Sequence, residues 1–119
     1  MAQVRIDVTW NPSNQGITVS PDPATVQWSR SDPGKDDTAK WVLSNDGGDN
    51  KAKITSIAFT TGGGKGCFGT LAPEVGSDEK KWNGRDLNRQ NGRYKYAVTV
   101  TGGASSGTLD PEVIEGDKP

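Results

Sequence analysis

Hydrophobic and polar residues alternate along several short stretches of the chain. Between residues 4 and 10 every second residue is apolar, and the residues between them are polar. A period of two is typical of a half-buried β-strand. The stretch 40–44 holds three consecutive apolar residues, which favours a central strand. The strands predicted in this way are residues 4–10, 17–19, 26–28, 40–44, 54–59, 94–100 and 108–114.

Glycine, proline, asparagine and aspartate are dense between these strands and favour turns there. Pro111 interrupts the last predicted strand, which favours an edge or a bulge. Residues 67–90 show no clean period, so either a short strand or a short helical turn could form there. We expect the charged residues 115–119 to form a frayed tail.

Composition also favours a β fold. Nine Val and five Ile outnumber four Leu, and side chains branched at Cβ suit strands better than helices. Sixteen Gly and seven Pro are too many for long helices. About seven short strands separated by turns predict a sandwich or a barrel. The sequence shows no internal repeat and no boundary, so we expect a single domain over residues 1–119.

Aromatic residues must supply much of the core, because hydrophobic residues make up only 30% of the chain. Three of the four tryptophans lie in predicted strands with apolar neighbours and are expected inside: Trp10, Trp28 and Trp41. The stretch 94–100 places Tyr94, Tyr96, Val98 and Val100 on one face. We expect Trp41 to pack across from that face.

Three sequence runs follow the strand order of a known fold. Residues 17–21 read Ile-Thr-Val-Ser-Pro and lead to a Val-x-Trp run at 26–28. Residues 92–98 read Gly-x-Tyr-x-Tyr-x-Val, and the last run, residues 107–113, reads Gly-Thr-Leu-Asp-Pro-Glu-Val. These runs resemble the early, late and closing strands of the cupredoxin-like β-sandwich, and the closing run is similar to that of copper-free relatives. Immunoglobulin-type sandwiches share the strand pattern. The resemblance implies an all-β, Greek-key β-sandwich of about seven strands, cupredoxin-like or immunoglobulin-like.

The copper ligands of that family are missing. Copper cupredoxins use two His, one Cys and usually a Met, whereas this chain has no His and its single Met is Met1. Cys67 comes before the 94–100 strand, where the family places its cysteine after it. The resemblance therefore implies the scaffold without blue-copper chemistry, and we expect no cofactor and no metal.

The sequence does not contain a recognisable catalytic arrangement. The absence of His removes the commonest general base. Cys67 could be a lone nucleophile if Lys65 lowered its pKa, but a partly buried, small apolar side chain beside a glycine-rich turn is the preferred interpretation. Residues 61–66 are glycine-rich but do not match the spacing of a phosphate-binding loop.

Two acidic clusters could offer oxygen ligands to a hard cation such as Ca²⁺. They are Asp32, Asp36 and Asp37, and Asp46, Asp49 and Asn50. Aspartate and asparagine also favour turns by bonding their own backbone, and we prefer that interpretation.

A basic stretch surrounds the fourth tryptophan, Trp82. We expect a long loop over residues 69–91 to carry Trp82 to one end of the sandwich, flanked by Lys81 and Arg85. These three are the candidate partner-binding residues. Trp82 could instead fold back as a plug over that end, which we favour because tryptophan is usually largely buried. A solvated polar face is the preferred interpretation of the basic residues.

These observations predict a non-enzymatic binding or structural module, with a carbohydrate-binding module that uses exposed aromatic residues as the alternative. The partner would be a protein or a carbohydrate. The formal net charge of −1 gives no reason to expect nucleic acid, and no apolar run is long enough to suggest a membrane. The compartment stays open, because a signal peptide could have been removed.

Overall fold

The computed structural model describes residues 2–61 and 66–118. It contains ten strands and one short 3₁₀-helix, η1, at Pro33–Lys35. The strands are β1 (Gln3–Asn11), β2 (Gly16–Ser20), β3 (Ala24–Trp28), β4 (Thr38–Asn45), β5 (Lys53–Phe59), β6 (Phe68–Pro73), β7 (Lys81–Leu87), β8 (Gly92–Thr101), β9 (Ser106–Leu109) and β10 (Glu112–Asp117). In these two ranges there is no α-helix, and no helix has the length and apolar character needed to cross a membrane.

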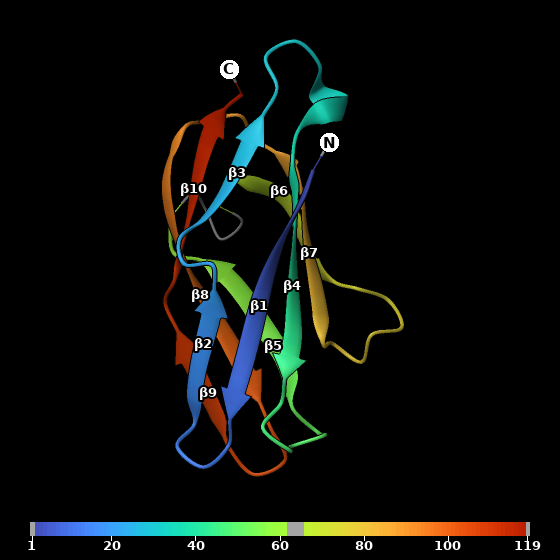
Figure 1. Ribbon diagram of the computed structural model, residues 1–119, viewed down its shortest axis with the longest axis vertical. Coiled ribbons are helices and arrows are strands. Elements are labelled where there is room, and N and C mark those ends of the chain that lie inside the picture. The colour runs from blue at the N-terminus through green and yellow to red at the C-terminus, as the bar shows by residue number, and fades with distance from the viewer. Residues whose placement is uncertain (1, 62–65, 119) are drawn as a thin grey trace.

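The strands form two sheets (Figure 1). The first has the order β2-β1-β4-β7-β6, and the second has the order β3-β10-β8-β5, with β9 also pairing with β8. Within them β1 runs parallel to β4, and β3 runs parallel to β10. The consecutive strands β2 and β3 belong to different sheets, so the chain crosses between the sheets at residues 21–23. This all-β arrangement of two sheets is compatible with a β-sandwich.

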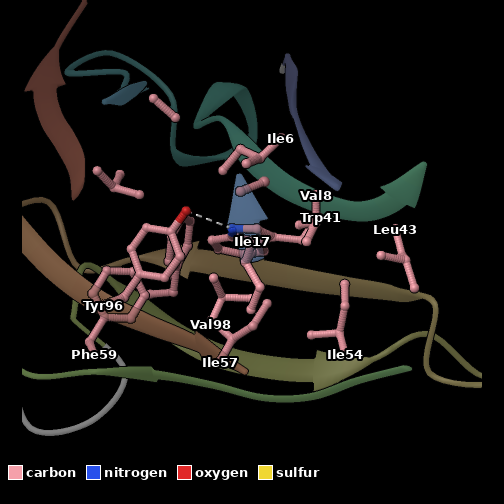
Figure 2. Close-up of a cluster of buried hydrophobic side chains, with 14 of the residues drawn as sticks. Ile6, Val8, Ile17, Trp41, Leu43, Ile54, Ile57, Phe59, Tyr96 and Val98 are labelled. Carbon is pink, nitrogen blue, oxygen red and sulfur yellow. Dashed lines mark hydrogen bonds between the residues drawn. The ribbon is translucent and has the colours of Figure 1, made fainter. Parts of the chain in front are cut away.

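Side chains from both sheets meet in a shared hydrophobic core (Figure 2). Trp41 of β4 and Tyr96 of β8 are fully buried, and their rings meet edge to face with centroids 5.6 Å apart. The Trp41 indole Nε1 donates a hydrogen bond of 3.1 Å to the Tyr96 hydroxyl. Val98 and Val100 are also fully buried, so the prediction that Trp41 packs across from this face is confirmed.

Six of the seven predicted strands fall within strands of the structure. The apolar stretch 40–44 is central as expected, because β4 lies between β1 and β7 and its residues Trp41, Val42 and Leu43 are all buried. The last predicted strand is divided at Pro111 into β9 and β10. Pro111 thus marks the break, and β10 itself lies inside its sheet between β3 and β8.

Residues 67–90 contain two strands, β6 and β7, where we expected one short strand or a helical turn. The alternation fails in β7 because an inward position is occupied by Gly84, where a Cβ atom would lie 3.1 Å from both Phe68 and Trp41. Beyond it, Asp86 has a positive φ of 61°, and Arg85 and Asp86 are both exposed. Because the core rings occupy the space at position 84, β7 has a glycine where the alternation would require an apolar side chain. The sequence pattern therefore does not indicate a strand here.

The expectation of a frayed tail at 115–119 is wrong for residues 115–117. These residues belong to β10, which pairs with β3 through Asp117. Glu115 is only 2% exposed, although its charge predicted solvent. Position 119 lies outside the described residues.

Two valines provide a matched test of the core. Val98→Ala should lower the free energy of unfolding by about 1–3 kcal/mol, because it removes buried apolar area and leaves a cavity. Val75→Ala should change it by less than about 0.5 kcal/mol, because Val75 is 100% exposed. Urea denaturation measures both, and equal effects of the two substitutions would contradict the assignment of inside and outside.

Candidate functional site

The three predicted site residues all lie in β7, but on its two opposite faces. Trp82 is partly buried and packs against the core. Its indole Nε1 donates a hydrogen bond of 2.8 Å to the carbonyl of Ile54 in β5, a strand of the other sheet. Lys81 and Arg85 occupy the alternate positions, which point away from the core. The structure therefore separates Trp82 from the two basic residues.

The long loop that we expected to carry Trp82 is instead a paired strand. Trp82 does fold inward, in the sense of the plug interpretation, but it joins β7 to β5 rather than covering an end. The neighbouring backbone strengthens this junction, because the Ile54 amide donates to the Glu79 carbonyl at 2.9 Å.

Two hollows lie beside β7, and Arg85 lines both of them. The larger has a volume of about 530 Å³, and Gln3, Asp36, Thr38, Asp86 and Arg89 also line it. The smaller has a volume of about 370 Å³ and adjoins the edge strand β6. We call the surface formed by Arg85 and the two hollows the Arg85 surface.

The smaller hollow combines apolar side chains with a few polar ones. Ala72, Pro73 and the fully exposed Val75 supply its apolar part. Glu74 also lines it and is held by Lys40, whose ammonium lies 3.0 Å from the carboxylate. That contact lowers the pKa of Glu74 below its ordinary value.

Arg85 has no acidic partner within the described residues, whereas Arg5, Lys40 and Arg89 each have one. Arg5 pairs with Asp7 at 2.8 Å, and Lys40 pairs with Glu74. Arg89 pairs with Asp36 at 3.1 Å. An exposed guanidinium between two hollows remains available to a carboxylate from outside the chain.

Arg89 forms a polar clamp with Asp36, the residue that follows η1, and this helix lies at one end of the molecule (Figure 1). Its Nε and Nη2 donate to both oxygens of Asp36 at 3.1 and 3.3 Å, and Nη2 also donates to the Ser29 carbonyl at 3.0 Å. The guanidinium lies 5.6 Å from the ring centroid of Trp28. Burial opposes the charge on Asp36, but the hydrogen bonds from Arg89 and the Ser29 amide outweigh it and lower its pKa.

Carboxylates of the two acidic clusters accept hydrogen bonds from groups of the protein itself. Asp32 accepts a hydrogen bond from the Gly34 amide at 2.9 Å, and Asp37 accepts one from the Gln27 amide at 3.0 Å. Asp46 accepts from the Gly48 amide at 2.9 Å, and Asp49 accepts from the Trp10 indole at 3.3 Å. Across the part of the chain that the structure describes, no three potential metal-ligating side chains come together. The contacts of Asp32 and Asp46 are the turn role that we preferred, whereas Asp37 and Asp49 bind groups that are distant in the sequence.

The described aromatic residues do not form an exposed row. Trp10, Trp41, Phe59, Phe68 and Tyr96 are buried. Trp28, Trp82 and Tyr94 are partly buried and pack against the core. A planar platform for sugars, which the carbohydrate-binding alternative requires, is therefore not found among them.

Sequence reasoning missed Glu115 as a buried residue, and it also missed Val75 as the exposed apolar residue of the smaller hollow. Val113 and Glu115 are both buried in the alternation of β10. Extending the period of two beyond Val113 would have placed Glu115 inside. Val75 carries no such signal, because it lies in the turn between β6 and β7.

The sequence matches no protein-family model, and no curated protein shows significant similarity to it. The fold and the surface therefore define a class only, an all-β protein of two sheets.

Cys67 is fully buried, where we expected partial burial. Burial, and then the charge of Glu115, raise its pKa to about 12. Lys65, the residue proposed to activate it, lies outside the described residues, as do Gly62, Gly63 and Gly64 of the glycine-rich run.

A thiol reagent tests this assignment. At mildly alkaline pH, Cys67 in the folded protein should react with Ellman's reagent at least about 100-fold more slowly than in the unfolded chain, because it is buried and almost entirely protonated. Reaction at comparable rates in the presence and absence of guanidinium chloride would show an accessible thiolate instead.

The junction made by Trp82 gives a second test. Trp82→Phe keeps a ring but removes the indole donor, which leaves the Ile54 carbonyl without it. The free energy of unfolding should fall by about 1–3 kcal/mol, the usual cost of an unsatisfied buried group. Urea denaturation measures this change, and an unaltered midpoint would show that the indole does not join the sheets.

Proposed function

We propose that this protein is a non-enzymatic binding module built on a copper-free, cupredoxin-like β-sandwich. Its binding site is the Arg85 surface, and its partner is a protein segment that carries a carboxylate beside an apolar side chain. The observation that carries the proposal is the exposed, unpaired guanidinium of Arg85 between the two hollows of the described surface.

The order of the strands supports the proposed scaffold. The run at 17–21 forms β2 and leads across to β3 in the other sheet. The run at 92–98 lies in β8, inside the second sheet, and the run at 107–113 spans β9 and the start of β10 beside it. The two parallel pairs favour the cupredoxin-like form over an immunoglobulin constant-type sandwich, which is built from antiparallel sheets.

The chemistry of the surface supports a peptide ligand. Arg85 presents a planar fork of donors that suits a carboxylate. The smaller hollow offers Ala72, Pro73 and Val75 to an apolar side chain. β6 is the edge of the first sheet, and an edge strand offers backbone groups to an extended segment. One bound segment can therefore use all three features together.

The test is selection of a random peptide library, displayed on phage, against the immobilised protein. Selected peptides should carry Asp or Glu next to an apolar residue. Arg85→Gln should weaken their binding at least about 10-fold in calorimetry, because a charge-assisted hydrogen bond is worth about 1.5–3 kcal/mol.

Arg93→Gln is the matched control. Arg93 is also an exposed arginine, with 65% of its side chain accessible, but it lies in β8 of the second sheet. Its substitution should leave the affinity unchanged. Peptides that bind Arg85→Gln as well as they bind the unaltered protein would overturn the proposed site.

A further inference from the structure

The connection between β6 and β7, residues 74–80, projects from the first sheet (Figure 1). Two consecutive turns build it, because two of its amides donate to carbonyls three residues earlier, at 3.2 and 3.1 Å. Val75 and Asp78 are the first central residues of these two turns, and both are exposed. We call residues 74–80 the hairpin tip.

The backbone of the hairpin tip is fixed at the base of its second turn. Asp78 and Glu79 have positive φ values of 55° and 59°, in a region that costs energy for residues other than glycine. The amide of Ile54 in β5 donates to the Glu79 carbonyl at 2.9 Å, which ties this turn to the second sheet. The conformation at the tip is therefore maintained by a contact with the sandwich.

The side chains of the hairpin tip match the chemistry of the Arg85 surface. Val75 is 100% exposed, and no other large hydrophobic side chain in the described residues is exposed to a comparable extent. Asp78 forms no ion pair within residues 2–61 and 66–118. An apolar side chain and an unpaired carboxylate therefore lie close together in the sequence, as in the ligand that suits the smaller hollow and the Arg85 guanidinium.

The hairpin tip and Arg85 lie at opposite ends of the same hairpin. Arg85 of β7 pairs with Thr70 of β6, and the tip begins four residues after Thr70, roughly 13 Å away along the strand. Two such hairpins, placed head to tail about a twofold axis, bring each tip to the Arg85 of the other copy. A twofold interface requires one patch that carries both a group and its complement, and this hairpin carries both.

We propose that the partner of the Arg85 surface is a second copy of this chain, bound in a twofold-symmetric dimer through the β6–β7 hairpins. Val75 of each copy enters the smaller hollow of the other, and Asp78 of each copy pairs with Arg85 of the other. Such a dimer rests on the binding function proposed for the Arg85 surface, since it uses the same guanidinium and the same hollow. Because only two hairpins meet, the interface is small and the dimer exchanges with the monomer.

Sedimentation equilibrium tests the dimer. Between about 0.02 and 1 mM protein, the average mass should rise from that of a monomer toward that of a dimer, as expected for a small interface. Val75→Ser should weaken the association at least about 10-fold, because the contact then buries less apolar area on both copies. Arg93→Gln, which alters an exposed arginine of the second sheet, is the control and should leave it unchanged. A chain that stays monomeric at about 1 mM would overturn the dimer.

Two charge reversals test the pairing of Asp78 with Arg85. In a dimer of Arg85→Glu alone, or of Asp78→Lys alone, like charges meet at both contacts, so each variant should associate at least about 10-fold more weakly. In an equimolar mixture of the two variants, opposite charges meet at both contacts, and association should return. Both positions are exposed, and far-UV circular dichroism checks that each variant folds. A mixture that associates no better than its components would contradict the proposed interface.

Failure of the dimer can be told apart from failure of the proposed binding function. A monomeric protein whose selected peptides lose affinity in Arg85→Gln would overturn the dimer and leave the binding function in place. Peptides that bind Arg85→Gln without loss would overturn the binding function, whatever the mass of the protein. Association that persists in both Val75→Ser and Arg85→Glu would place the contact on another surface, and the dimer proposed here would be wrong.

Discussion

The contact between Trp41 and Tyr96 joins the central strands of the two sheets, β4 and β8, and the rest of the structure depends on it. Each ring carries one polar group into a fully buried site, and each group must find a partner there. They find each other, at 3.1 Å between the indole nitrogen and the phenol oxygen. Because a hydrogen bond tolerates little displacement, this pair sets the spacing and the relative position of the sheets.

Other core residues are arranged around this pair. Phe68 meets Trp41 edge to face with centroids 5.9 Å apart, and Phe59 lies 5.2 Å from Tyr96. A Cβ atom at Gly84 would lie 3.1 Å from both Phe68 and Trp41, so these rings leave little room for a side chain there. The same burial raises the pKa of Tyr96 well above its ordinary value, so its hydroxyl stays protonated over the physiological range.

Polar chemistry is consequently confined to the margins of this core. At one end, Arg89 and Asp36 form an ion pair, and the buried Glu115 has no ion pair within the described residues. On the outer surface, Arg85 stands between two hollows with its guanidinium free of acidic neighbours in the described structure. The two places differ in the charge that is missing, because Glu115 has no cationic partner and Arg85 has no anionic partner within the described residues. We propose partner binding at the second of these places.

The sequence by itself determined the β class, the seven predicted strand segments and the face that carries Tyr96 and Val98, because a strand with one buried face writes a period of two into its residues. It did not predict β7 as a strand, because the inward position that would complete the alternation is Gly84. Phe68 and Trp41, which belong to other strands, crowd that position. Of the candidate site, Arg85 stays a candidate, whereas Trp82 turned inward because its indole finds a carbonyl in the opposite sheet. Glu115 was taken for a solvated charge, and only the pairing of β10 between β3 and β8 puts it inside. Local pattern records which residues alternate, but which of them share a surface is decided by strand pairing between residues far apart in the chain.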